Sequence, residues 1–316
     1  MKKSLLVVLA MVCVLTVSIG VYSASDLVLA TGGTAGTYYP LGGAIANIAN
    51  KRIAKMNIAA QATGASIENM RLIDKADADL AIVQNDTAYY AWNGAEAFAG
   101  KPIKGFGVIA ALYPEVVQCV VAANSPIKSI NDLKGKRVSV GAPGSGTEAN
   151  ARQVLGVHGL TYADIDEQFL SFAESANQFK DGQIDAFFVT AGIPNPGITD
   201  VSTQHKIRIL SIAADKTKQM TAEYPFLVAS TVPANTYMNQ PEPAYTAQIV
   251  ALLIAGNHMS EAEVYQIAKM LFENDGELAR AHAKGELITL KTALDGATAP
   301  IHPGAAKYYK EKGILK

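Results

Sequence analysis

Two glycine-rich loops contain the residues whose types and spacing could bind a ligand. Residues 31–51 read TGGTAGTYYPLGGAIANIANK, with five glycines among the first thirteen residues, and residues 141–147 read GAPGSGT. We expect a helix to begin at the end of each loop. The first backbone N–H groups of a helix have no partner within it, and the helix dipole places roughly half a positive charge there. Glycines that let a ligand approach these groups therefore predict an anion site built without a charged side chain.

A small carboxylate fits these loops better than a phosphate or a dinucleotide. A Walker phosphate loop ends in Gly-Lys-Ser/Thr, and neither loop contains a lysine. Residues 32–36 also lack the glycine spacing of a dinucleotide site. The expected ligand-binding residues, from both loops and from the ends of two strands, are Thr34, Ala35, Gly36, Thr37, Tyr38, Gln84, Asn85, Ser145, Gly146, Thr147, Glu148, Thr190 and Gly192.

Other roles stay open for some of these side chains. The hydroxyl groups, such as those of Ser145 and Thr147, are also typical of loop capping and turns. Glu148 either caps its own helix or accepts the ammonium group of a ligand. In the second case an amino acid would be favoured over a plain dicarboxylate.

Catalytic chemistry finds little support in the sequence. The stretch 144–146, GSG, does not form the Gly-x-Ser-x-Gly nucleophile elbow. No two histidines have the spacing of a metal-binding motif, and they are scattered as His158, His205, His258, His282 and His302. We therefore expect no catalytic residue, no metal and no cofactor, and we expect that the protein is not an enzyme. His302 is expected to help a turn hold the C-terminal helix.

The elements that must position the loops alternate between strands and helices, which is typical of an α/β protein. Strands are expected at 26–30, 58–62, 79–83, 137–140, 168–172 and 185–189, and helices at 41–55, from Ser66 as N-cap, from Glu148 and around Ser175. The order of strand, glycine loop, helix, strand, helix and strand thus occurs twice. The repetition predicts two similar lobes, although α/β chains often repeat this order without forming two.

Two segments are expected to cross between the lobes. The first is 106–122, strand-like and broken at 113–115, and the second is 226–233. After them we expect helices at 245–255 and 260–272, the latter with a capping box formed by Ser260 and Glu263. The predicted division is therefore 24–118 with 232–316 as lobe I and 119–231 as lobe II.

The first 23 residues are expected to be a secretory signal peptide, cleaved after Ser23. A short basic start precedes an apolar run at 5–19 and then small residues. A retained membrane anchor is the alternative, but the run is short for a span of about 20 residues. Cleavage predicts a periplasmic protein with Cys119 as its one cysteine, expected in a buried strand, and with Cys13 removed. The mature chain would carry a charge of about −3 and no basic block, which argues against nucleic-acid binding.

Several motifs, in order along the chain, carry a resemblance to a known family. Residues 30–42, ATGGTAGTYYPLG, closely resemble the N-terminal signature of the TAXI family of solute receptors for TRAP transporters. Further matches are ADLAIVQ at 78–84, YPE at 113–115, DLKGKRV at 132–138, GAPGSGTE at 141–148 and IHPGA at 301–305. The resemblance covers essentially the whole mature chain.

This resemblance implies a periplasmic-binding-protein fold of the type II kind, with each lobe a sheet flanked by helices and two hinge crossings between them. It also implies delivery of a ligand to a membrane TRAP permease, usually a fused one, with import driven by an ion gradient. Family ligands include glutamate, glutamine-like compounds and C4–C5 dicarboxylates such as 2-oxoglutarate. A sister family of receptors holds the ligand's carboxylate with an arginine. No arginine here clearly matches that residue, because Arg71 and Arg152 lie on expected helices and are not expected to point into the cleft. A secreted hydrolase of a small amide or ester, or a surface interaction protein, are the alternatives.

Overall fold

The computed structural model describes residues 25–274 and 276–316, so the predicted signal peptide and Cys13 lie outside the described residues. The strands are β1 (Ser25–Ala30), β2 (Met56–Gln61), β3 (Leu80–Gln84), β4 (Phe106–Ala122), β5 (Arg137–Ser139), β6 (Asp166–Gln168), β7 (Ala186–Ala191), β8 (Ile207–Leu210), β9 (Val228–Val232) and β10 (Ala244–Gly256). The α-helices are α1 (Tyr38–Arg52), α2 (Ser66–Asp74), α3 (Asn85–Asn93), α4 (Gly146–Val157), α5 (Phe172–Lys180), α6 (Pro196–Gln204), α7 (Ala214–Glu223), α8 (Glu261–Phe272), α9 (Glu277–Ala281) and α10 (Pro303–Glu311).

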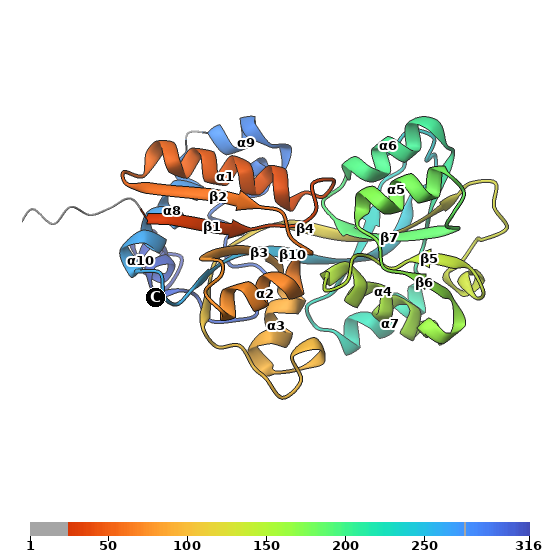
Figure 1. Ribbon diagram of the computed structural model, residues 1–316, viewed down its shortest axis with the longest axis horizontal. Coiled ribbons are helices and arrows are strands. Elements are labelled where there is room, and N and C mark those ends of the chain that lie inside the picture. Colours follow the sequence, from red (N-terminus) through yellow and green to blue (C-terminus); the bar gives the residue numbers. More distant parts are fainter. Residues whose placement is uncertain (1–24, 275) are drawn as a thin grey trace, which may run out of the picture.

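The molecule has two lobes, each a stretch of sheet flanked by helices, joined by the long strands β4 and β10 (Figure 1). We call the part with β1–β3, α1–α3 and α8–α10 the first lobe, and the part with β5–β9 and α4–α7 the second lobe. The strands follow the order β2-β1-β3-β10-β4-β7-β5-β6, with β8 paired to β4 and β9 to β10. The expected α/β fold class is therefore confirmed.

Helices cover both faces of the sheet in each lobe. Leu80 and Ile82 of β3 pack into one apolar core with α1, while Ala81 and Val83 pack into another with α2. All four side chains are fully buried, as expected for a strand covered on both faces. In the second lobe α5 and α6 lie on one face and α4 and α7 on the other (Figure 1).

The segment 245–255 was expected to be a helix, and this prediction is wrong. It belongs to β10, which pairs with β3, β4 and β9. The run from Ile249 to Gly256 is apolar at nearly every position because the strand is buried on both faces. Such a run shows neither the helical period of 3.6 residues nor the strand period of 2, so the pattern alone does not distinguish a strand from a helix. The expected break at 113–115 is also absent, because β4 continues through it with register shifts against β10.

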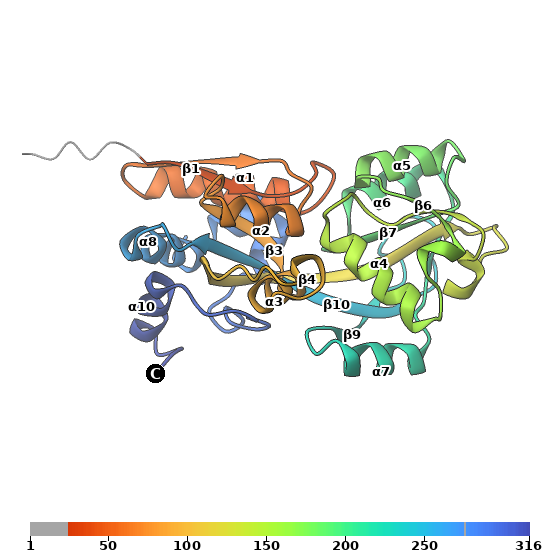
Figure 2. The same cartoon turned by 60° about the horizontal axis from the view of Figure 1, so that its bottom comes forward.

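The second crossing is therefore made by β10 and not by 226–233. That segment contains β9, which lies with α7 in the second lobe (Figure 2). The lobe boundaries at 118/119 and 231/232 stay a prediction.

Three local expectations can be compared with the structure. The capping box of Ser260 and Glu263 is confirmed at the start of α8, and His302 is confirmed as N-cap of α10, where its ring accepts the Gly304 N–H. Ser66 is not the N-cap of α2: Ala65 occupies that position, and the Ser66 hydroxyl accepts the Gln84 N–H at 3.0 Å instead.

Cys119 is buried in β4, as expected, and burial raises the pKa of its thiol. None of the helices in residues 25–274 and 276–316 combines the length and the apolar composition that a membrane span requires.

Candidate functional site

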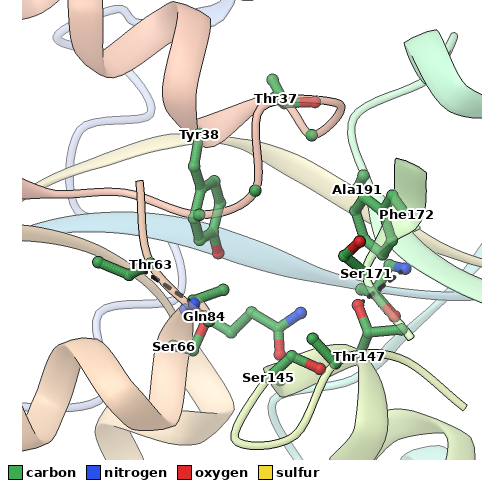
Figure 3. A pocket seen from close by; sticks show the side chains of 18 of the residues that line it. Thr37, Tyr38, Thr63, Ser66, Gln84, Ser145, Thr147, Ser171, Phe172 and Ala191 are labelled. Carbon is green, nitrogen blue, oxygen red and sulfur yellow. Dashed lines mark hydrogen bonds between the residues drawn. The ribbon is translucent and has the colours of Figure 1, made fainter. Parts of the chain in front are cut away.

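A cavity of about 70 Å³ lies between the two lobes, with room for several water molecules at roughly 10–15 Å³ each. Its walls come from both glycine loops, the starts of several helices and the ends of strands (Figure 3). The lining residues are Gly32, Gly33, Gly36, Thr37, Tyr38, Thr63, Gly64, Ala65, Ser66, Gln84, Glu115, Ala142, Ser145, Gly146, Thr147, Ser171, Phe172, Thr190 and Ala191. A small solute would therefore contact both lobes at once.

Two of the helix starts at the cavity, those of α2 and α5, are already capped. The Ile67 and Glu68 N–H groups of α2 donate to the Gly144 carbonyl of the second lobe, at 3.1 and 3.3 Å. The start of α5 has a capping box formed by Ser171 and Glu174. Their first N–H groups are thus largely occupied by the protein itself.

The starts of α1 and α4 remain open to a ligand. Thr37 precedes α1 and makes no side-chain cap, and Tyr38 is the first residue of the helix. At α4, the Ser145 hydroxyl accepts the Glu148 N–H at 3.2 Å, and no cap accepts from Gly146 or Thr147 among the described residues. These starts belong to different lobes and line the same cavity.

The structure brings part of the expected ligand-binding set together at this cavity. The members that line it are Gly36, Thr37, Tyr38, Gln84, Ser145, Gly146, Thr147 and Thr190. In Figure 3 the Tyr38 hydroxyl points toward Gln84, and Ser145 and Thr147 face them from the second lobe. Their contact with a ligand stays a prediction.

Five expected residues lie outside the cavity. The Glu148 carboxylate pairs with Arg152 at 2.8 Å and accepts the Tyr162 hydroxyl at 2.7 Å; among the described residues it makes no capping bond to α4, so the capping alternative is not borne out. The Asn85 side chain turns toward β10, where its oxygen accepts the Val250 N–H at 3.2 Å. Gly192 faces Lys284 and Tyr113 instead of the cavity.

The other two lie in the first glycine loop. Thr34 is exposed, and the carbonyl of Ala35 accepts a hydrogen bond from Asn195 at 3.4 Å. Arg71 and Arg152 do not line the cavity, and among the described residues no lysine or arginine does.

The sequence analysis missed Glu115, a carboxyl group in the cavity wall. Its side chain is only 2% exposed, and the Tyr38 hydroxyl donates to Glu115 Oε2 at 2.7 Å. In the described part of the chain it makes no ion pair. An acidic residue inside the mostly apolar run 106–122 was the available signal. Thr63, Ser66, Ser171 and Phe172 were also missed.

Burial raises the pKa of the Glu115 carboxyl to about 8, although the Tyr38 hydrogen bond opposes the shift and the nearby Asp86 adds to it. The neutral acid therefore predominates at pH 7 without ligand. Burial also raises the pKa of Asp86 to about 6, against hydrogen bonds from Asn150 and Thr87.

The raised Glu115 pKa predicts how stability depends on pH. Because the folded state holds this proton more tightly than the unfolded state does, the stabilisation is complete below the unfolded pKa near 4.5 and is lost as pH rises toward 8. Between pH 6 and 8, above most of the Asp86 titration, the free energy of unfolding of ligand-free protein should fall by about 2 kcal/mol. Urea denaturation should show this fall in the wild type and a smaller one in Glu115→Gln. Equal slopes in the two proteins would contradict the assignment.

Two further polar atoms at the cavity lack partners. Gln84 Oε1 and Thr190 Oγ1 are buried without a hydrogen bond in the described structure, and both residues line the cavity. Buried polar atoms are normally paired, since leaving one unpaired costs about 1–3 kcal/mol. A ligand that donates hydrogen bonds would satisfy them.

Contacts between the lobes hold the cavity closed. Asn150 of α4 donates to Asp86 of α3 at 2.8 Å. On the other side Lys284, in the short 3-10 helix Ala283–Leu287, donates to the Ile193 carbonyl at 2.5 Å. Burial lowers the pKa of this lysine. The structure thus has the two lobes drawn together around the cavity.

Comparisons with known proteins agree with this architecture. The profile of the NMT1-like family matches residues 29–313. The putative aliphatic sulfonates-binding protein of Escherichia coli (strain K12) is 31% identical over 102 residues, which are 32% of this chain and 30% of that protein. The match thus spans under a third of that relative's length.

Two solved structures share the fold. The alkanesulfonate-binding protein SsuA from Xanthomonas axonopodis pv. citri, bound to MOPS, has a TM-score of 0.51 and 14% identity, covering 93% of this chain and 95% of its own. The binding protein component of an ABC phosphonate transporter from Pseudomonas aeruginosa has a TM-score of 0.52 and 11% identity, covering 83% and 79%. At such identities the likeness extends to the two-lobed periplasmic-binding-protein fold alone.

Proposed function

The chain belongs to the NMT1-like family, and we propose that it is an extracytoplasmic solute receptor. It binds a small carboxylate between its lobes and delivers it to a membrane permease. Binding shifts a balance between open and closed forms through contacts that only the closed form makes. The predicted signal peptide supports a periplasmic location.

One observation carries this proposal: the open starts of α1 and α4, one from each lobe, line a single cavity whose described lining contains no lysine or arginine. Backbone N–H groups at helix starts bind small anions without a charged side chain. A carboxylate held by both starts would also link the lobes, which is what a closing receptor requires.

The permease is proposed to be of the TRAP type, with fused small and large subunits. The support is the TAXI resemblance of the motifs at 30–42, 78–84 and 141–148. The glutamate-like amino acids and C4–C5 dicarboxylates of that family, such as 2-oxoglutarate, are the first ligands to test.

A sulfonate receptor for an ABC transporter is the second candidate. It is favoured by the 31% identity over 102 residues to a protein named as an aliphatic sulfonates-binding protein. A sulfonate is also a small anion that two helix starts could hold, so the ligand must be tested directly.

A thermal-shift screen of residues 24–316 tests the proposed function. The probes are L-glutamate, L-glutamine, 2-oxoglutarate, succinate, ethanesulfonate and taurine. A ligand at a hundred times its Kd should add about 2.7 kcal/mol to the free energy of unfolding and raise the melting temperature. A shift with sulfonates alone would favour the second candidate. A protein that no probe stabilises would fit a surface interaction protein, and turnover of amides or esters would reveal a hydrolase.

A further inference from the structure

We propose that Glu115 binds the ammonium group of the ligand, so that the cavity selects α-amino acids over the matching 2-oxo acids. This inference rests on the proposed function, since it names the ligand class of the same cavity. Glu115, the proposed partner of the ligand's ammonium group, lies outside the predicted binding set.

The position of Glu115 suits this role. It lies in β4, on a strand shared by both lobes, and lines the cavity with its side chain almost fully buried. The Tyr38 hydroxyl donates its hydrogen bond to Glu115 Oε2. Tyr38 is also the first residue of α1, so its side chain connects the carboxyl group to one of the two expected carboxylate-binding helix starts.

No described protein cation balances Glu115. The titratable groups that face it are Tyr38 from α1, Tyr113 from β4 and Asp86 from α3, and none of these carries positive charge. Lys284 lies next to Gly192 and donates to the Ile193 carbonyl. A dicarboxylate would therefore place negative charge against a buried acid, whereas an amino acid brings its own balancing cation.

The cavity also offers the acceptors that an ammonium group needs. An ammonium group has three donors, as lysine shows. Besides Glu115, Gln84 and Thr190 line the cavity, and their Oε1 and Oγ1 atoms are buried without partners in the described structure. Both adjoin the start of α4: an added Cβ on Gly146 would lie 1.7 Å from Gln84 Oε1, and the Thr190 N–H donates to Thr147 Oγ1. Acceptors for the amine thus lie beside the helix starts expected to hold the carboxylate, as an α-amino acid requires.

The rival arrangement keeps Glu115 protonated, so that it donates to a second carboxylate of a dicarboxylic acid. The two arrangements predict opposite pH dependences. An ammonium ligand needs ionised Glu115, so its affinity should rise up to about tenfold per pH unit from pH 6 toward 8. A dicarboxylate that accepts a hydrogen bond from the neutral acid should lose affinity as pH rises through 8.

The experiment is isothermal titration of residues 24–316 with matched pairs of ligands. The pairs are L-glutamate and 2-oxoglutarate, L-aspartate and oxaloacetate, L-alanine and pyruvate, and L-leucine and 4-methyl-2-oxopentanoate. The test variant is Glu115→Gln, which keeps the shape and removes the charge. The control is Glu311→Gln on α10, since Glu311 also accepts a tyrosine hydroxyl, from Tyr265 at 2.6 Å, but lies outside the cavity lining.

At pH 8 we expect at least one amino acid to bind wild type about tenfold or more tighter than its 2-oxo acid. Glu115→Gln should lose about 30-fold or more of the amino-acid affinity, with little change for the 2-oxo acid and no pH slope. Glu311→Gln should behave as wild type. If Glu115→Gln does not fold, the change in amino-acid affinity of the wild type between pH 6 and 8 tests the inference by itself.

Three results would overturn the inference. The first is unchanged amino-acid affinity in Glu115→Gln, and the second is amino-acid binding to wild type that does not tighten from pH 6 to 8. The third is a wild type that binds 2-oxo acids but no amino acids, which leaves the proposed carboxylate receptor standing. A wild type that binds no probe in this set or in the thermal screen contradicts the proposed function as well.

Discussion

Replacing Gly146 by alanine is expected to weaken ligand binding strongly while leaving the protein folded. A Cβ at this position would lie 1.7 Å from Gln84 Oε1 and 2.3 Å from Gln84 Cδ. Gln84 belongs to the first lobe and Gly146 starts α4 in the second, so the added methyl group must displace Gln84 in the cavity or hold the lobes apart. Overpacking of this kind costs about 1–3 kcal/mol, and we expect an affinity loss of about 100-fold.

The measurement is isothermal titration with the best ligand of the thermal screen, alongside the melting temperature without ligand. Gly156→Ala is the matched control: it lies in the same helix, and a Cβ there meets nothing within 4 Å. The control should bind normally and be slightly more stable, because alanine favours a helix over glycine. Normal affinity in Gly146→Ala would contradict the assignment of the cavity as the binding site.

Replacing Gly304 by alanine should have the largest effect on stability. Gly304 lies in the first turn of α10, where it packs against α8 so closely that a Cβ would be 2.2 Å from the Glu261 carbonyl oxygen and 2.8 Å from the Tyr265 nitrogen. These are backbone atoms, which cannot move aside as a flexible side chain can. We expect a loss of about 3 kcal/mol in the free energy of unfolding.

Thermal and urea denaturation test this prediction. Gly43→Ala in α1, where a Cβ meets nothing within 4 Å, is the control and should be neutral or stabilising. Ligand affinity of Gly304→Ala should be normal at temperatures where it is folded. Wild-type stability in Gly304→Ala would show that α8 and α10 do not pack as described.

The loops and their helices were predictable because their signals are local. Glycines precede α1 and α4, and polar residues lie at the end of β3, so the sequence alone indicated approximately where these helices start and where this strand ends. Because each loop follows a strand and precedes a helix, Thr37 and Gly146 could be placed at the carboxyl-terminal edges of their sheets. Their approach to a single cavity followed from the repeated order of elements.

The misassigned β10 and the missed Glu115 depended on tertiary contacts. The apolar run of β10 can be assigned as a strand only once β3 and β4 are known to pair with its two edges. The role of Glu115 depends on Tyr38, 77 residues away, and on the cavity that the second lobe completes. The Glu148 side chain, in contrast, has a local partner. Arg152 lies one helical turn away, and the i,i+4 spacing of the two residues is enough to predict their ion pair.

A crystal structure of residues 24–316 with the ligand of largest thermal shift tests the central claim most directly. That claim is that helix starts from both lobes hold the ligand's carboxylate. We expect carboxylate oxygens within about 2.7–3.2 Å of backbone nitrogens at the start of α1 and at Gly146 or Thr147 of α4. A carboxylate held by a lysine or arginine side chain, or bound outside this cavity, would contradict the claim.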